Sequence, residues 1–357
     1  MTRYVLLAFI VNLLAIKCFS QCKSNFSDYG EAAKCRDSVI SLELGSDKQA
    51  NQYNYTIFTN LKFLFLDHDS LFEIPSDVYQ CLGLRQLEAG SNQIEKIPSG
   101  ISKLKSLETL SLFDDQIREI DDSIGKLSAL RQLALNGNRF KTLPSSMASL
   151  SKLENIDIGN NPKLDMNQAF EVLSKMQGIK TMGLYKMNLV SLPGSLKNLH
   201  NLESVDLSYN KRLPLDSVIK SLQNCHGLKV LTFEGNKADS VPQSVIRLSN
   251  LEEIDLDSNK IKTLPENLFF LENLKILRLA KNKLRTVPKG ISKLQNLEEL
   301  DLSNNNLKKL PDEIGELKSL KTLYVYDNDI DDAQAGKIKD MLPGVKILFK
   351  NPDSVTY

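Results

Sequence analysis

Three histidines are the side chains best suited to acid–base chemistry in this 357-residue chain. His68 lies between Asp67 and Asp69, but no serine or cysteine is spaced to form a catalytic group with it. His200 and His226 fall in predicted turns. No phosphate-binding loop, zinc-ligand spacing or paired-carboxylate motif occurs. The sequence therefore predicts no catalytic residue, no metal ligand and no cofactor, and we expect a protein that is not an enzyme.

Carboxylates recur at matching positions along the chain and form the second chemically suggestive pattern. They are Asp157, Asp206, Glu234, Glu253, Asp255, Asp257, Glu299 and Asp301. Crowded carboxylates can bind Ca²⁺, but no loop has a recognisable calcium-binding spacing, so solvated charge is the simpler interpretation. Their density also favours a partner with a basic or hydroxyl-rich surface.

A leucine-rich phrase positions these residues, because it recurs at an almost fixed interval. Each copy reads LxxLxLxxNxL, usually followed by LPxxIxxL, and the steps of 23 residues lengthen to 26 only after Leu153 and Leu202. The copies begin at Leu61, Leu84, Leu107, Leu130, Leu153, Ile179, Leu202, Leu228, Leu251, Leu274, Leu297 and Leu320. This period and pattern predict a leucine-rich repeat solenoid.

The apolar positions of the phrase predict how the copies pack. The first, fourth and sixth positions are apolar, as in Leu251, Ile254 and Leu256. Alternation along a strand sends the third, fifth and seventh positions to the opposite face. One copy cannot bury its leucines alone, so neighbours must stack. We expect an α/β solenoid, a leucine-rich repeat horseshoe with a parallel β-sheet on the concave face and short helices or turns on the convex face.

The ninth position is usually asparagine, whose amide both donates and accepts hydrogen bonds where the chain leaves the strand. We predict that this asparagine ladder is structural. Asp69 and Asp115 are tolerable substitutes in it, whereas Met187 predicts a local irregularity. The two lengthened copies predict α-helices on the convex side, each with an aspartate, Asp165 or Asp216, near its start.

The third, fifth, seventh and eighth positions line the predicted concave face and supply the candidate site. Several carry large aromatic side chains with no core to fill, and exposed aromatic residues on a rigid sheet can anchor a partner. Incidental aromatic content is the alternative. Charges alternate in sign at the second position, which predicts a ladder of ion pairs and no binding role. The predicted ligand-binding residues are Phe113, Asp157, Tyr185, Asp206, Tyr209, Asp255, Tyr324 and Tyr326.

The first twenty residues predict export. Arg3 precedes an apolar run from Tyr4 to Ile16, and a small-residue site ends at Ser20, which is the pattern of a secretory signal peptide. The run is too short to span a membrane. Acylation at Cys18 or Cys22 is disfavoured because neither follows a small residue. We expect an exported protein, secreted or held in the periplasm or cell envelope, without membrane insertion.

The expected organisation is a signal peptide over 1–20, an N-terminal cap with an incomplete repeat over 21–60, about twelve repeats over 61–344, and a terminal cap strand and tail over 345–357. Cys22 and Cys35 flank the cap, where an exported protein can form a disulfide, although spacing alone leaves this open. Cys81 and Cys225 are predicted to be small buried hydrophobic residues.

Composition narrows the range of partners. The formal net charge is +1, with 41% hydrophobic and 25% charged residues. Such a balance provides no global basic field for nucleic acid and no polybasic stretch for anionic lipid. We therefore expect a protein or peptide ligand, with a glycan as the alternative.

The copies resemble the LPxxIxxLxxLxxLxLxxNxL class of leucine-rich repeat proteins from about Val39 to Phe349. With its leader, the chain is similar to exported bacterial members. The resemblance implies a protein-binding scaffold, and our leading hypothesis is an exported module that binds a protein or peptide on its concave sheet. A glycan-binding adhesin is the alternative, and a cytosolic signalling scaffold would follow if the leader is not functional.

Overall fold

The computed structural model describes residues 24–351. The predicted signal peptide, Cys22 with its possible disulfide to Cys35, and the last residues of the predicted tail lie outside this range. The chain divides into two compact units, Met1–Gly183 and Leu184–Tyr357, called the first and second unit below.

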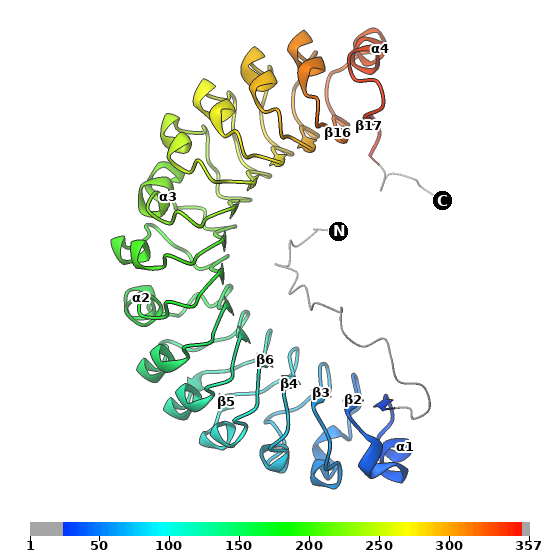
Figure 1. Cartoon of the computed structure of the whole chain (residues 1–357), viewed down its shortest axis with the longest axis vertical. Coiled ribbons are helices and arrows are strands. Elements are labelled where there is room, and N and C mark those ends of the chain that lie inside the picture. The colour runs from blue at the N-terminus through cyan, green and yellow to red at the C-terminus, as the bar shows by residue number, and fades with distance from the viewer. Residues whose placement is uncertain (1–23, 352–357) are drawn as a thin grey trace. The chain divides into compact units, whose positions relative to one another are not determined.

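Short parallel strands form the sheet of the first unit, one strand for each successive copy (Figure 1). Leu64 pairs with Leu87, and Leu87 pairs with Leu110, so the fourth positions of successive copies align. Two further strands, β5 (Lys96–Ile97) and β7 (Glu119–Ile120), form a small separate sheet. The strands of the main sheet, in spatial order, are β1 (Asn25–Phe26), β2 (Ser41–Glu43), β3 (Phe63–Phe65), β4 (Gln86–Glu88), β6 (Thr109–Ser111), β8 (Gln132–Ala134), β9 (Asn155–Asp157) and β10 (Thr181–Gly183).

The second unit repeats this arrangement, with every strand beside the next one along the chain. Its register aligns the fifth positions of the copies in one row, which runs Asp206, Thr232, Asp255, Arg278, Asp301, Tyr324. The strands are β11 (Ser204–Asp206), β12 (Val230–Thr232), β13 (Glu253–Asp255), β14 (Ile276–Arg278), β15 (Glu299–Asp301), β16 (Thr322–Tyr324) and β17 (Lys346–Leu348).

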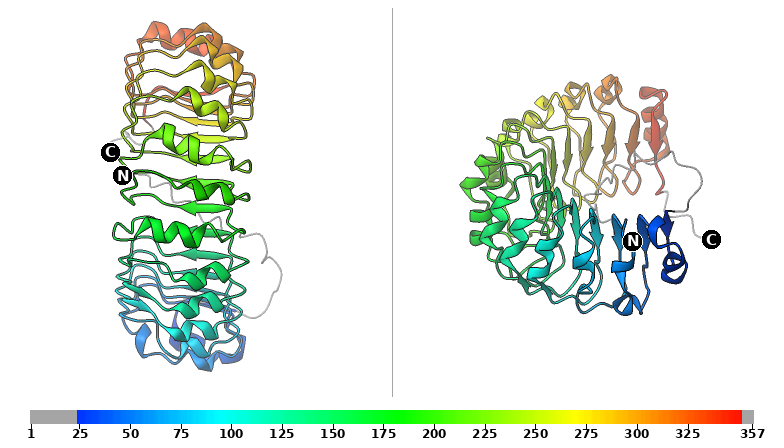
Figure 2. Two further views of the ribbon diagram at one scale, coloured as in Figure 1. Left: turned by 90° about the vertical axis from the view of Figure 1, so that its left-hand side faces the viewer. Right: turned by 60° about the horizontal axis from the view of Figure 1, so that its bottom comes forward.

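Helices lie along the convex side of the strands in each unit (Figures 1 and 2). Ordinary copies have five-residue 3-10 helices: Ser99–Lys103, Asp122–Lys126, Ser145–Ser149, Gly194–Asn198, Gln243–Arg247, Glu266–Phe270, Lys289–Lys293 and Asp312–Glu316. Shorter 3-10 helices cover Arg36–Ser38, Ala50–Gln52, Tyr55–Ile57 and Val78–Gln80. Within residues 24–351, no helix is long and apolar enough to cross a membrane.

The two lengthened copies have true α-helices, as predicted: α2 (Met166–Leu173) and α3 (Leu215–Leu222). Asp165 caps α2 by accepting hydrogen bonds from the backbone amides of the second and third helical residues. In α3, Pro214 occupies the cap position and Asp216 lies in the first turn, where it pairs with Lys220 at 2.6 Å.

Two more α-helices belong to the ends of the described chain. They are α1 (Tyr29–Lys34) near the N-terminal end and α4 (Asp332–Met341) near the C-terminal end, each capped by the aspartate that precedes it. Cys35 is exposed, whereas Cys81 and Cys225 are buried as predicted.

The core of each unit consists of the aliphatic positions of the phrase. Leu251, Ile254 and Leu256 are fully buried in the second unit, as are Leu84 and Leu87 in the first. Burying one such side chain contributes roughly 1.5–3 kcal/mol. Stacking therefore makes each copy depend on its neighbours and holds the sheet in register.

The asparagine ladder is structural, as predicted. The Nδ2 group of Asn92 donates to the carbonyl oxygens of Leu66 at 2.8 Å and Ala89 at 2.9 Å, and its Oδ1 accepts from the amide of Leu71 at 3.0 Å. At the position of the predicted irregularity, Met187 is buried and the next residue, Asn188, has a left-handed backbone with φ of 56°. Lys237 has the same left-handed backbone after the ladder residue Asn236, so this feature is not specific to Met187.

Candidate binding face of the sheet

The candidate site residues lie on the side of the strands away from the helices. In the first unit, Phe113 follows β6 and is half-buried. Its ring lies over Gly90, because a Cβ atom added there would come within 2.4 Å of the Phe113 Cδ1 atom. The absence of a side chain at Gly90 thus makes room for the ring and holds it against the sheet.

Asp157 in the first unit is more enclosed than we expected. Its carboxylate accepts from the amide of Gly159 at 2.9 Å, and only 9% of the residue is exposed. Gly183 on the adjacent strand covers it closely, since a Cβ there would lie 2.4 Å from Oδ1. The expectation of a solvent-facing carboxylate was wrong, because the carboxylate turns back to its own backbone.

We call the side chains at the third, fifth, seventh and eighth positions of the copies, from Tyr185 to Asp327, the second-unit face. Tyr209 is fixed on it: its hydroxyl donates to Glu234, and its ring lies over Gly235. The Ser258 hydroxyl also donates to Glu234, at 3.2 Å. The Nζ atom of Lys186 lies 5.6 Å from the centre of the Tyr209 ring. Tyr209 and Glu234 therefore form one preorganised group.

Asp206 and Asp255, at fifth positions of this face, are buried, so the expectation of solvent-facing carboxylates was wrong here too. Each accepts a hydrogen bond of 2.9 Å from the backbone amide two residues later, which draws it toward the sheet. Burial raises the pKa of each carboxyl to about 6. These two aspartates are therefore more buried than Glu234 and Asp257, which are half-buried.

Arg278 is a feature of this face that the sequence analysis missed. Its guanidinium pairs with Glu253 and, at 3.2 Å, with Glu299, so it bridges third-position carboxylates from both neighbouring strands. A signal for it was present, because it is the only basic residue in the fifth-position row of the second unit. The sequence alone does not show that both of its neighbours point toward it.

Tyr324 and Tyr326 lie at the C-terminal end of the second-unit face, and both are half-buried. Tyr324 ends β16 and is aligned with Asp301 on one side and Leu348 on the other. Tyr185, also half-buried, lies at the opposite end of the face. Tyr185 and the pair Tyr324 and Tyr326 thus lie on opposite sides of the carboxylates in the direction across the strands.

The second-position charges form the predicted ion-pair ladder, outside the candidate site. Arg131 pairs with Glu154 at 2.7 Å in the first unit, and Lys275 pairs with Glu252 at 2.6 Å in the second. Exposed pairs of this kind contribute only about 0.2–1 kcal/mol each. Their effect is to align neighbouring strands.

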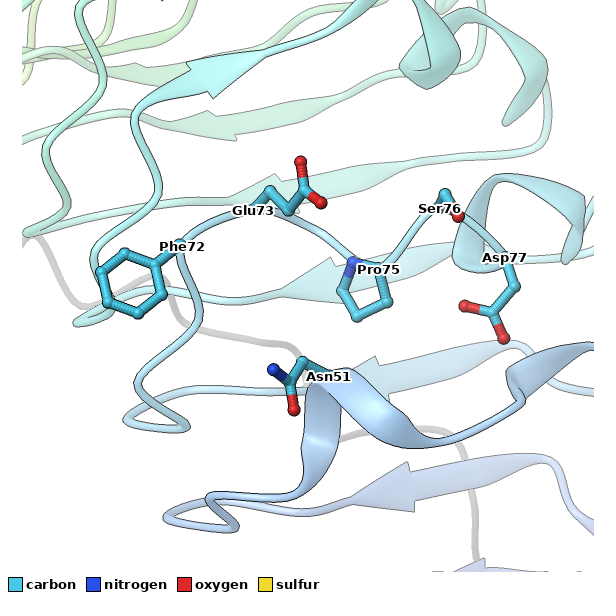
Figure 3. Close-up of a pocket in the computed structure, with 6 residues that line it drawn as sticks. All are labelled: Asn51, Phe72, Glu73, Pro75, Ser76 and Asp77. Atoms are coloured by element: carbon cyan, nitrogen blue, oxygen red, sulfur yellow. The ribbon is translucent and has the colours of Figure 1, made fainter.

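A separate hollow of about 350 Å³ lies in the first unit (Figure 3). Phe72 at one end is 67% exposed, and the Asp77 carboxylate at the other accepts from the amide of Tyr55 at 2.6 Å. The hollow is lined by Asn51, Phe72, Glu73, Pro75, Ser76 and Asp77. It includes none of the predicted site residues. Over residues 24–351, no group of three or more histidine, cysteine, aspartate or glutamate side chains could hold a metal ion.

Comparison with solved structures supports the solenoid fold. A leucine-rich repeat protein of Leptospira interrogans is 24% identical, with a TM-score of 0.58 over 91% of this chain and 100% of that one. Internalin InlF of Listeria monocytogenes is 20% identical, with a TM-score of 0.68 over 88% of each chain. TLR13, solved in a complex with ssRNA13, is 23% identical, with a TM-score of 0.65 over 93% of this chain and 51% of that one.

The family assignment comes from the sequence itself. No curated protein sequence matches the chain. A family model described as "Leucine-rich repeat region" matches residues 57–219 and 215–304, and a model of two leucine-rich repeat copies matches residues 295–335. Together with the stacked parallel strands and the asparagine ladder, these matches show that the chain belongs to the leucine-rich repeat family and has its α/β solenoid fold.

Proposed function

We propose that this protein is an exported, non-enzymatic interaction module that binds a protein or peptide on the sheet face opposite its helices. The observation that supports this most directly is the preorganised Tyr209–Glu234 group on the second-unit face. A rigid aromatic side chain beside a polar group can anchor a partner with little loss of conformational entropy on binding. The regular strand register extends such a surface along the unit.

Export is part of the proposal and rests on the leader sequence. N-terminal sequencing of the natural protein should find a chain that begins near Gln21. An intact Met1 would instead favour a cytosolic scaffold.

Peptide-display selection on the full chain tests the binding proposal. Selected peptides should bind Tyr209→Ala and Tyr324→Ala variants at least fivefold more weakly, since loss of an anchor costs about 1 kcal/mol or more. The matched control is Phe270→Ala, which removes a 45% exposed ring from the convex side.

Two results would reject the proposal: no selected peptide, or an equal loss of affinity in Phe270→Ala. A glycan array tests the alternative function, which is binding of a sugar. Selective sugar binding that is lost in Tyr209→Ala would favour a glycan-binding adhesin instead.

A further inference from the structure

Negative charge is concentrated on the second-unit face, although the chain has a formal net charge of +1. The basic residues on this face are Lys186, Arg278 and Lys281. The acidic residues are Asp206, Glu234, Glu253, Asp255, Asp257, Glu299, Asp301 and Asp327. The acidity of the face therefore results from where the charges are placed and not from the composition of the chain.

The basic residues of the face are already engaged. Arg278 is paired with Glu253 and Glu299, and Lys186 lies over the Tyr209 ring. Burial raises the pKa of Asp301, and the nearby charge of Lys281 partly opposes that rise. Little positive charge is left to compensate the other carboxylates.

The central carboxylates are held by neutral donors. Glu234 accepts from the hydroxyls of Tyr209 and Ser258, and Asp257 accepts from the amide of Ala280 at 2.7 Å. Hydrogen bonds of this kind orient a carboxylate but do not neutralise its charge. Excess negative charge consequently remains between β12 and β15.

Crowding makes this excess charge unfavourable at Asp255 and Asp257. Burial raises the pKa of both carboxyls. The charge of Asp255, followed by those of Asp301 and Glu234, also raises the pKa of Asp257, while Arg278 lowers that of Asp255. The pair consequently retains a proton at a pH where free carboxyls are ionised. A cation placed above the pair would displace that proton and be attracted by the whole cluster.

The strand register suggests how a partner could match the face. Asp255 and Asp301 occupy alternate strands of the fifth-position row, so they are roughly 9.5 Å apart across two strand spacings. An extended chain in the polyproline II conformation advances about 3.1 Å per residue and presents the same side at every third residue. A segment crossing the strands would therefore bring a basic side chain into range about every third residue.

We infer that the second-unit face binds an extended segment of another protein that carries several lysine or arginine side chains. This inference rests on the proposed function and specifies the partner by charge complementarity. Tyr185 and Tyr209 at one end of the face, with Tyr324 and Tyr326 at the other, provide ring surfaces for the aliphatic stems and charged ends of such side chains. A polyanion such as a nucleic acid would be repelled.

The test measures binding of three labelled peptides to the full chain by fluorescence anisotropy. One peptide carries a lysine or arginine at every third residue, and the other two carry glutamate or glutamine there. Only the basic peptide should bind, more weakly at high salt. Its affinity should rise between pH 6 and pH 9, because the Asp255–Asp257 pair must release its proton.

Matched variants locate the binding. Glu234→Gln combined with Asp257→Asn should weaken binding of the basic peptide at least tenfold and flatten its pH dependence. Glu272→Gln combined with Glu316→Gln removes the same charge from exposed convex positions and should change affinity less than twofold. If circular dichroism shows that the face variant is unfolded, Asp327→Asn replaces it, because that aspartate is exposed on the same face.

Three results would overturn the inference: equal binding of the basic and acidic peptides, unchanged affinity in the face variant, or an equal loss in the convex variant. The peptide-display selection described above distinguishes a failure of this inference from a failure of the proposed function. Selected peptides that need Tyr209 but lack basic residues would overturn the inference alone. A selection without any face-dependent peptide would overturn both.

Discussion

Asp115 occupies in its copy the position that Asn138 occupies in the next, but only one oxygen of Asp115 makes a hydrogen bond. Its Oδ1 accepts from the amides of Asn92 at 3.1 Å and Ile94 at 3.0 Å, whereas its buried Oδ2 has no partner. In Asn138 the corresponding amide donates to three carbonyl oxygens, at 2.7, 3.1 and 3.4 Å. An ionised Asp115 cannot donate in this way, and burial raises its pKa to about 7.

We predict that the stability of the first unit falls as pH rises. The pKa of Asp69 is raised to about 6 and that of Asp115 to about 7, mainly by burial and also by the charges of Asp47, Asp67 and Asp114, despite the hydrogen bonds that each carboxyl accepts. Unfolded aspartate titrates near 3.9. The folded chain thus holds protons that the unfolded chain loses, and this stabilisation is full below about pH 4 and is lost by about pH 7.

Thermal unfolding of the wild type and of Asp69→Asn/Asp115→Asn between pH 5 and pH 8 measures this effect. Each retained proton changes the free energy of unfolding by up to about 1.4 kcal/mol per pH unit. The double variant should lose much less stability across the range. If the stability of both proteins changed with pH in the same way, Asp69 and Asp115 would be ionised in the folded chain across this range, and the prediction would be wrong.

Introducing a carboxylate into the asparagine ladder should make the stability of the protein more dependent on pH, whereas removing one makes it less so. Asn138→Asp replaces a buried donor to the carbonyl oxygens of Leu112 and Leu135. We expect a loss of about 1–3 kcal/mol at pH 8, the cost of leaving buried polar groups unpaired, with partial recovery at pH 5. The control is Asn306→Asp, which makes the same change at an exposed position. Equal unfolding free energies for the two variants at pH 8 would be inconsistent with a structural ladder.

Gly90→Ala should destabilise the first unit through Phe113. The added methyl group would meet the ring at about 2.4 Å, so the ring must move. Overpacking of this kind typically costs about 1–3 kcal/mol. A double-mutant cycle with Phe113→Ala should recover most of that loss, and Gly194→Ala is the control because nothing lies within 4 Å of its added Cβ. If the stability losses of Gly90→Ala and Phe113→Ala were simply additive, the strain in Gly90→Ala would not arise from the Phe113 ring.

Removing Arg278 should leave Glu253 and Glu299 without their shared cation. Arg278→Ala is expected to lower the free energy of unfolding of the second unit by about 1–3 kcal/mol, since uncompensated carboxylates remain partly buried. Adding Glu253→Gln and Glu299→Gln should restore stability, as measured by denaturant unfolding. Lys281→Ala is the matched cation control. Failure of the glutamine substitutions to rescue would mean that the arginine acts through packing alone.

The sequence by itself determined the periodic features of this protein. The 23-residue step and the alternation of leucines dictate which residues are buried, because stacked copies must repeat the same contacts. Local chemistry determined the helix starts at Asp165 and Asp331, since a side-chain cap needs only the next few backbone amides. The asparagine ladder was readable because asparagine recurs at the ninth position of the copies, although its hydrogen bonds reach into the neighbouring copy.

Only the tertiary structure decided the electrostatic character of the site. The pairing of Arg278 with Glu253 and Glu299 joins side chains that lie on three different strands, more than twenty residues apart in the chain. The burial of Asp206 and Asp255 depends on where each carboxyl turns, and alternation along a strand does not specify this. Hydrogen bonding and pKa depend on individual atoms, whereas the repeat pattern specifies only faces and registers.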